Sequence, residues 1–258
     1  MELEELRHKC RDGSYSGPTS GHAVGHVQAN MVILPQSDAD EFREFCKANP
    51  KPCPILEELA PGDPVPMNVA PGADVRTDLP RYRVFRDGTP VDEPNDISDL
   101  WRDDLVTFLL GCSFIAEEAL FEAGLTLAHI EDTGTGFVPM YRTGVATNPA
   151  GRFHGPMVVS MRPFLPADAD RAEEVTSHYP MAHGGPIHRG DPAEIGIRDI
   201  NEPEFGAAVT ISEGQIPMFW ACGVTPQEAI LNARPELAIT HLPGCMFVAD
   251  ISAASTRV

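Results

Sequence analysis

The 25 prolines and 22 glycines of this 258-residue chain are the feature that most limits its fold. They are spread singly along the chain, so they interrupt any long helix or strand at short intervals. The sequence shows no internal repeat and no low-complexity segment. It therefore predicts a compact fold built from many short elements that are joined by turns.

The first third of the chain predicts strands that alternate with a helix. Residues 27–34, VQANMVIL, are typical of a buried strand. A helix capped by Ser37 or Asp38 should follow directly and end at Pro50. After an irregular stretch that is rich in proline and glycine, residues 81–85 predict a second strand, closed by a turn.

The middle of the chain contains the longest apolar run. From Ser98 the spacing of apolar residues predicts a long helix that includes residues 105–116, breaks at Gly111 and stops at Gly124. The remaining elements should be short: strands at 125–130, 137–141, 156–161, 216–221 and 246–249, and helices at 168–177 and from 225.

This order of elements predicts an α/β fold, because strands alternating with helices are typical of a layered α/β architecture. The hairpin-like middle suggests a smaller two-layer domain set into the main one. We therefore predict a discontinuous main domain at residues 1–120 and 210–258, and a smaller domain at residues 121–209.

Charge and cysteine content narrow the class of protein. The formal net charge is −19, from 38 acidic and 19 basic residues, so the averaged field repels nucleic-acid phosphates and anionic membranes. The six cysteines lack paired C-x-x-C spacing, which suits reduced thiols in the cytoplasm. No apolar run spans a bilayer, and the N-terminus has no apolar signal core. We expect a cytoplasmic protein that binds neither nucleic acid nor membrane. The sequence is compatible with a homo-oligomer.

The segment TPQE at residues 225–228 is the strongest local signal. Thr225 as a cap, a proline after it and a carboxylate three residues later predict the start of a helix. The turn Cys222-Gly223-Val224 should then present free N–H groups at the positive helix end. Such a turn can hold a carboxylate or an oxyanion and favours the thiolate of Cys222. The alternative is that Cys222 packs as a small hydrophobic residue.

A second candidate is the segment MAHGGPIHRGDP at residues 181–192. It is too rich in glycine and proline for a helix or a central strand, so it predicts a loop held by the scaffold. His183, His188 and Asp191 are candidates for proton transfer or, although their spacing matches no specific zinc pattern, for binding a metal. A purely structural loop is the alternative.

Three arginines are candidates for holding a carboxylate, because a guanidinium pairs with it through two parallel hydrogen bonds. Arg142 and Arg162 each follow an apolar strand, and Ser160 lies beside Arg162. Arg76 alternates with aspartates in GADVRTDLPR, where a solvated ladder of ion pairs is the alternative.

Nine segments, taken in order, resemble the bacterial hydro-lyases that are grouped with the D-glutamate cyclases. They are QANMVILP, FCKANPKPCP, APGADVRTDLPRYRV, WRDDLVTFLLGCSF, VPMYRT, GRFHGPMVVSMRP, HGGPIHRGDP, MFWACGVTPQ and THLPGCMFVAD. The resemblance implies a three-layer α/β/α domain with a smaller two-layer α+β domain. It also implies an enzyme that eliminates water, with cyclisation of D-glutamate to 5-oxo-D-proline as the suggested reaction.

A glutamate-like substrate assigns roles to the candidate residues. Its carboxylates need cationic or N–H partners, its amine must be neutral to attack, and the departing hydroxyl needs a proton. The predicted substrate-binding residues are Arg76, Arg142, Ser160, Arg162, Gly223 and Thr225. The predicted catalytic residues are His183, His188, Asp191 and Cys222, the last as a possible nucleophile. Ring closure within one molecule requires no cofactor and no metal.

Two other functions fit the same residues. One is a dehydratase of a hydroxy acid, assisted by a metal held by His183, His188 and Asp191. The other is a non-enzymatic protein that binds a small carboxylic acid in an arginine-lined cleft.

Overall fold

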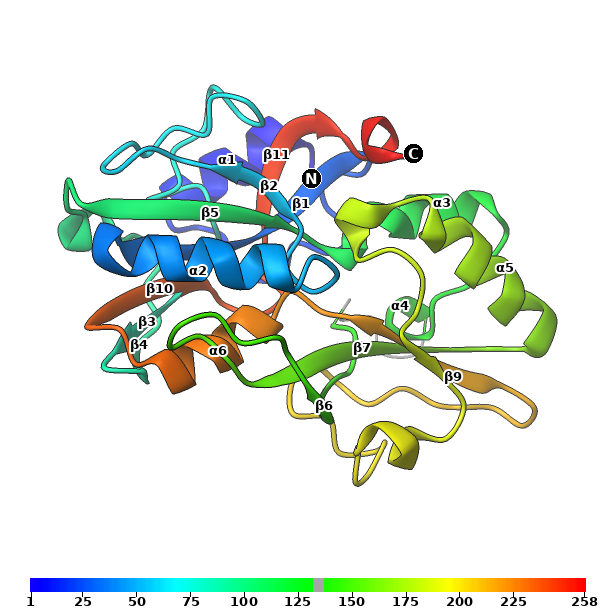
Figure 1. The fold of residues 1–258 in the computed structure, drawn as a ribbon. Helices are drawn as coiled ribbons and strands as arrows, with labels where there is room; N and C mark the ends of the chain where they lie inside the picture. The colour runs from blue at the N-terminus through cyan, green and yellow to red at the C-terminus, as the bar shows by residue number, and fades with distance from the viewer. Residues whose placement is uncertain (132–136) are drawn as a thin grey trace.

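The computed structural model describes residues 1–131 and 137–258, which form helices and two separate β-sheets (Figure 1). Sheet A contains β1 (His26–Pro35), β2 (Ile55–Glu58), β3 (Tyr82–Arg86), β4 (Thr89–Asp92), β5 (Leu105–Gly111), β10 (Leu237–His241) and β11 (Phe247–Ser252). Sheet B contains β6 (Met140–Ala146), β7 (Pro156–Phe164), β8 (His188–Arg189) and β9 (Ile216–Ala221). The helices are α1 (Leu3–Arg11), α2 (Gln36–Ala48), α3 (Glu117–Glu122), α4 (Ala128–Glu131), α5 (Pro166–Ser177) and α6 (Thr225–Ala233).

The strands of both sheets pair in antiparallel fashion. Sheet A has the order β2-β5-β1-β10-β3-β4, and β11 pairs with β1. Strand β1 changes partner along its length, because Val32 and Ile33 pair with β10 whereas Gln28 and Ala29 pair with β11. Sheet B has the order β6-β7-β9-β8. The predicted mixture of helices and sheets is confirmed.

The two faces of sheet A are covered differently. Helices α2 and α6 cover one face, where Phe42, Phe45 and Ile230 pack against β1 and β5. The other face is covered largely by irregular chain, which includes residues 59–79. The arrangement as three layers, α/β/α, is therefore not confirmed.

Sheet B also has two different faces. Helices α3 and α5 pack on one face, against Met218 and Trp220 of β9. Residues 187–211 supply the apolar side chains that cover the other face. Because β9 pairs with β7 and β8, the predicted domain boundary at residue 210 falls within the chain that builds sheet B. The domain limits stay a prediction.

The long helix predicted through residues 105–116 is wrong, because residues 105–111 form strand β5. This strand lies between β2 and β1, and all seven of its residues are buried. A strand that is covered on both faces has apolar side chains at every position, so it lacks the alternation that distinguishes a strand from a helix. Gly111 ends the strand, and a Cβ atom there would lie 1.8 Å from the carbonyl oxygen of Met181. The strand predicted at residues 125–130 is also wrong, since α4 begins there at Ala128.

Two predicted helix caps are wrong although the helices exist. Helix α2 begins at Gln36, so Ser37 and Asp38 lie inside its first turn. Helix α6 begins at Thr225 with Val224 as its N-cap. The Thr225 hydroxyl bonds to the carbonyl of Cys222, 2.7 Å away, and does not cap the helix.

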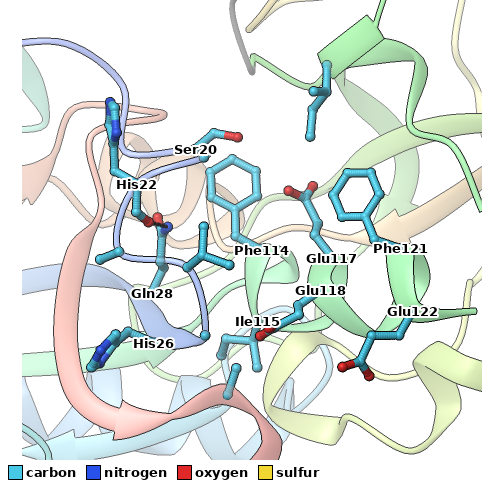
Figure 2. Close-up of a pocket in the computed structure, with 16 residues that line it drawn as sticks. Ser20, His22, His26, Gln28, Phe114, Ile115, Glu117, Glu118, Phe121 and Glu122 are labelled. Carbon is cyan, nitrogen blue, oxygen red and sulfur yellow. Dashed lines mark hydrogen bonds between the residues drawn. The ribbon is translucent and has the colours of Figure 1, made fainter. Parts of the chain in front are cut away.

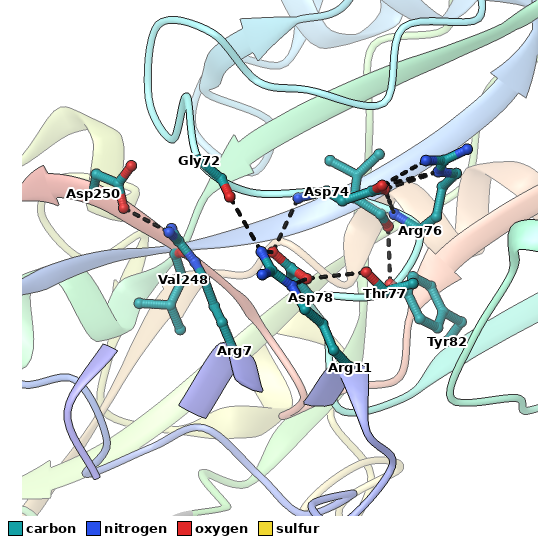
Figure 3. A network of polar contacts seen from close by, with 11 residues as sticks. Arg7, Arg11, Gly72, Asp74, Arg76, Thr77, Asp78, Tyr82, Val248 and Asp250 are labelled. Carbon is teal, nitrogen blue, oxygen red and sulfur yellow. Dashed lines mark hydrogen bonds and ion pairs between the residues drawn. The ribbon is translucent and has the colours of Figure 1, made fainter. Parts of the chain in front are cut away.

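A network of arginines and aspartates ties α1 to β11 of sheet A and to the irregular layer that covers the sheet (Figure 3). Arg7 Nη1 donates to Asp250 Oδ1 at 2.7 Å. Arg11 makes a bidentate pair with Asp78, Nε to Oδ1 at 2.5 Å and Nη2 to Oδ2 at 2.6 Å. The Asp78 side chain is fully buried, so α1 supplies the guanidinium that neutralises its charge.

None of the helices in the described ranges is long and apolar enough to cross a membrane.

Candidate functional site

Two connections cross between the sheets at one place, and they define the candidate site. The chain passes from β5 of sheet A through residues 112–116 to α3 on sheet B. It returns from β9 of sheet B through residues 222–224 to α6 on sheet A. Asn30 of β1 lies where both connections begin: its Nδ2 donates to the carbonyl oxygen of Gly111, the last residue of β5, at 2.7 Å, and it would lie 1.9 Å from a Cβ atom at position 223. Glycine at position 223 therefore permits the close approach of sheet A to this turn.

Arg162 on β7 is the centre of a buried polar cluster at this crossing. Its side chain is 3% exposed. Nη1 donates to Ser160 Oγ at 3.2 Å, and Nη2 donates to Ser113 Oγ at 3.2 Å and to Glu117 Oε1 at 2.7 Å. The buried Nε–H has no partner among the described residues. Because an unpaired buried donor costs free energy, this N–H is a candidate contact for a ligand.

Glu117 links Arg162 to a buried histidine. His129 Nε2 lies 3.0 Å from the same oxygen, Oε1, that accepts from Arg162. Burial raises the pKa of Glu117, but the hydrogen bonds and charges of His129 and Arg162 outweigh it, so the net pKa is lowered. The Glu117 carboxylate is therefore ionised at neutral pH.

His183 is a candidate proton acceptor that follows a turn packed against residues 113–116. It follows the turn at Pro180–Ala182, which packs on Gly111, and it has a left-handed backbone with φ of 73°. Non-glycine residues rarely hold this conformation, and such strain is concentrated at functional sites. Nδ1 bonds to the carbonyl oxygen of Lys51 at 2.7 Å and so carries the proton, which leaves Nε2 of the neutral ring as an acceptor.

Burial and nearby charge keep His183 neutral. Burial lowers its pKa to about 4, and the positive charges of Arg162 and Lys51 act in the same direction against the hydrogen bond to the Lys51 carbonyl. His183 can therefore accept a proton at neutral pH, but it is a weak base.

The turn after β9 is buried, and Cys222 within it is a thiol. Burial raises the pKa of Cys222 to about 11, and this outweighs the opposing hydrogen bond from Val224 and the charge of Arg162. The predicted stabilisation of the thiolate is therefore wrong. Cys222 Sγ instead contacts Met140 Sδ at 3.4 Å. The N–H of Gly223 has no partner in the described part of the chain, as the predicted oxyanion contact requires.

Thr225 stabilises this turn through hydrogen bonds between its hydroxyl and the backbone. Its Oγ1 bonds to the carbonyl of Cys222 at 2.7 Å and accepts from the N–H of Val158 at 3.0 Å. These contacts engage the hydroxyl with the backbone of β7 and of the turn, and the contact of Thr225 with a substrate stays a prediction.

His188 and Asp191 lie on the other face of sheet B. His188 is opposite Phe219, which is opposite Met161, and paired residues of an antiparallel sheet share a face. Arg162 is next to Met161 in β7 and therefore points to the opposite face. His188 Nε2 bonds to the carbonyl oxygen of Asp191 at 2.8 Å, while the Asp191 carboxylate accepts from the backbone of residue 193. The structure does not bring this pair to the cluster around Arg162.

Arg142 and Arg76 are paired with carboxylates of the protein and lie outside the cluster. Arg142 Nη2 is 2.8 Å from Glu228 Oε1, and this hydrogen bond raises the pKa of Arg142. Arg76 Nη2 is 2.6 Å from Asp74 Oδ2, in the irregular layer of sheet A. Of the three predicted arginines, Arg162 alone is joined to Ser160 and Glu117.

Four residues of the cluster were missed in the sequence: Asn30, Ser113, Glu117 and His129. Ser113 and Glu117 lay within or beside the apolar run that was assigned to a helix. Once residues 105–111 are recognised as a strand, these side chains follow its end, where functional groups are often found. His129 had no comparable signal, because its contact with Glu117 depends on the tertiary fold.

A pocket of about 230 Å³ adjoins the cluster at Glu117 (Figure 2). Its lining includes the glycine-rich segment 20–26 together with Phe114 and Phe121. Within residues 1–131 and 137–258, no group of three or more His, Cys, Asp or Glu side chains is placed to hold a metal ion.

Comparisons with known proteins agree on one family. A family model described as D-glutamate cyclase matches residues 106–250, which include every residue of the cluster except Asn30. A Bordetella pertussis protein named putative hydro-lyase is 57% identical over 247 residues, which cover 96% of this chain and 88% of its own. A Bacillus licheniformis protein of the same name is 55% identical, covering 97% and 95%. Another, from Bacillus subtilis, is 50% identical over the full length of both chains.

Proposed function

This chain belongs to the D-glutamate cyclase family, and we propose that it is a hydro-lyase acting on a small amino or carboxylic acid such as D-glutamate. The product from D-glutamate would be 5-oxo-D-proline and water. The observation that carries the proposal is the buried cluster around Arg162, which combines unpaired N–H donors with a neutral histidine at the crossing between the sheets.

The unpaired donors are suited to a carboxylate. Arg162 offers a buried Nε–H beside its three hydrogen bonds, and the turn after Cys222 offers the N–H of Gly223. A low-dielectric site that is already lined with donors stabilises negative charge without having to reorganise. Arg162 and Gly223 would therefore hold the carboxylate that is attacked and the oxyanion that forms from it.

Proton transfer is assigned to His183. In the ring closure a C–N bond forms between the amine and the side-chain carboxyl carbon, and a C–O bond breaks. The ammonium group gives up two protons in total, and both leave with one carboxylate oxygen as water. Nε2 of the neutral His183 accepts the first proton and returns it to the departing oxygen. Attack within one molecule supplies the required proximity.

Glu117 and Cys222 have supporting roles in this scheme. Glu117 holds the guanidinium of Arg162 in place through a 2.7 Å ion pair. Cys222 is protonated at neutral pH, so the scheme uses no thioester and assigns the cysteine to packing against Met140.

Replacement of His183 tests the proposal. The asparagine side chain in His183→Asn retains a donor for the Lys51 carbonyl but lacks Nε2, so turnover should fall by about 10²- to 10⁴-fold with little change in thermal stability. His188→Asn is the matched control, since it removes a histidine from the other face of sheet B. Substrates should include D- and L-glutamate and the corresponding hydroxy acids, with products identified by mass spectrometry.

The outcomes separate the proposal from its alternatives. Full turnover in His183→Asn contradicts the assignment of the base, and loss of turnover in His188→Asn alone favours a site at His188 and Asp191 on the other face of sheet B. Carboxylate binding that requires Arg162 but yields no product from any substrate would indicate a binding protein, which the same unpaired donors would also suit.

A further inference from the structure

The pocket beside Glu117 has mainly apolar walls. Phe114, Ile115, Phe121 and Val24 line it, and its volume is about 230 Å³. Figure 2 shows the carboxylate of Glu117 directed into the space between the rings of Phe114 and Phe121. A pocket of this kind typically orients a small ligand through a few polar groups on an otherwise apolar wall.

One carboxylate oxygen of Glu117 lacks a hydrogen-bond partner in the part of the chain that the structure describes. Oε1 accepts from both Arg162 and His129, whereas Oε2 has no hydrogen-bond partner in the ranges that the structure describes. The side chain is 9% exposed, and Oε2 is not among the fully buried atoms that lack a partner, so it can be reached from the pocket. A partly desolvated carboxylate oxygen without a protein donor is suited to a ligand that brings an N–H group.

The charges on the lining favour a cation. The other acidic side chains are Glu118 and Glu122, and no lysine or arginine lines the pocket in the described ranges. The summed field should attract an ammonium group and repel a carboxylate.

We propose that this pocket is the subsite for the ammonium group of the substrate, which donates to Oε2 of Glu117. The ammonium group lies between Phe114 and Phe121, while the carboxylates of the substrate stay outside the pocket. The assignment to a substrate rests on the proposed function: the carboxylate contacts Arg162 while the ammonium contacts the pocket side of Glu117. The site then selects amino acids over hydroxy acids of the same carbon skeleton.

Binding of a minimal cation tests the subsite without any turnover. Isothermal titration of the full chain with n-butylammonium chloride should show binding, and sodium butyrate should not displace it. Glu117→Gln removes the charge and should weaken butylammonium binding about tenfold or more.

A second variant covers the case in which Glu117→Gln does not fold, since Arg162 would lose its partner. Phe121 is 46% exposed, so Phe121→Lys should fold while placing an ammonium group in the pocket. It should weaken butylammonium binding to a similar extent. The matched control is Leu165→Lys, which adds the same charge at a similarly exposed apolar residue that does not line the pocket, and should bind as the unmodified protein does.

The results distinguish the subsite from the proposed reaction. Absence of butylammonium binding to the folded protein, or equal binding by Phe121→Lys and Leu165→Lys, overturns the subsite even if amino acids are turned over. Butylammonium binding that is lost in Phe121→Lys supports the subsite even if no water is eliminated from any amino acid.

Discussion

Mild acid should destabilise this protein through two buried histidines, His183 and His241. His241 lies at the end of β10, where its Nδ1 accepts from the N–H of Met31 at 3.1 Å and its Nε2 has no partner among the described residues. Burial lowers its pKa to about 4, and the charge of Arg83 adds to the effect. The pKa of His183 is also lowered to about 4, mainly by burial.

The sign and size of the effect follow from linkage. The unfolded chain binds a proton at each histidine as the pH falls through 6.5, whereas the folded chain binds it only near pH 4. Stability is therefore fully present above pH 6.5 and is lost as the pH falls toward 4. Between pH 7.5 and pH 5.0 each histidine should cost about 2 kcal/mol of unfolding free energy, or about 4 kcal/mol for the pair.

Urea denaturation followed by tryptophan fluorescence at the two pH values measures this loss. His241→Asn keeps an acceptor for the N–H of Met31 but cannot titrate, so it should lose about 2 kcal/mol less than the unmodified protein. Replacing the exposed His8 by asparagine is the control for a general effect of histidine removal. Equal losses in the unmodified protein and His241→Asn would refute the reasoning.

Three further predictions concern packing and charge. Asp78→Asn leaves the half-exposed guanidinium of Arg11 without its charged partner and should cost about 2 kcal/mol in urea denaturation; an unchanged unfolding free energy would contradict a stabilising role for the pair. Gly111→Ala should greatly lower thermal stability, since its Cβ atom would meet a carbonyl oxygen at 1.8 Å, whereas Gly72→Ala, with open space around it, should not. Iodoacetamide should label Cys222 slowly at pH 7.5 in the native protein, since its pKa is about 11; rapid labelling would contradict its burial as a thiol.

Local sequence signals were sufficient for elements whose ends are marked by turn residues or by the start of a helix. The strand at residues 27–34 and the helix after it were predicted because apolar spacing, turn residues and length all agreed. The same signals failed for residues 105–111, because no glycine or proline separates them from Ser98, so their apolar side chains continue the helical spacing that begins there. Because of this one error, Ser113 and Glu117, which follow the strand, were not predicted as site residues.

The candidate site could be predicted only where its residues share a strand. Ser160 and Arg162 are two apart on β7, so any strand assignment places them on one face. His183 and His188 are five apart in an irregular segment. His188 is placed on the other face of sheet B by the pairing of β8 with β9, which no local pattern encodes. The close approach of Asn30 to Gly223 joins segments that are far apart in the chain. The site therefore exists only where the two connections between the sheets meet. A substitution that displaces either connection should disturb Arg162 even if the substituted residue does not contact it.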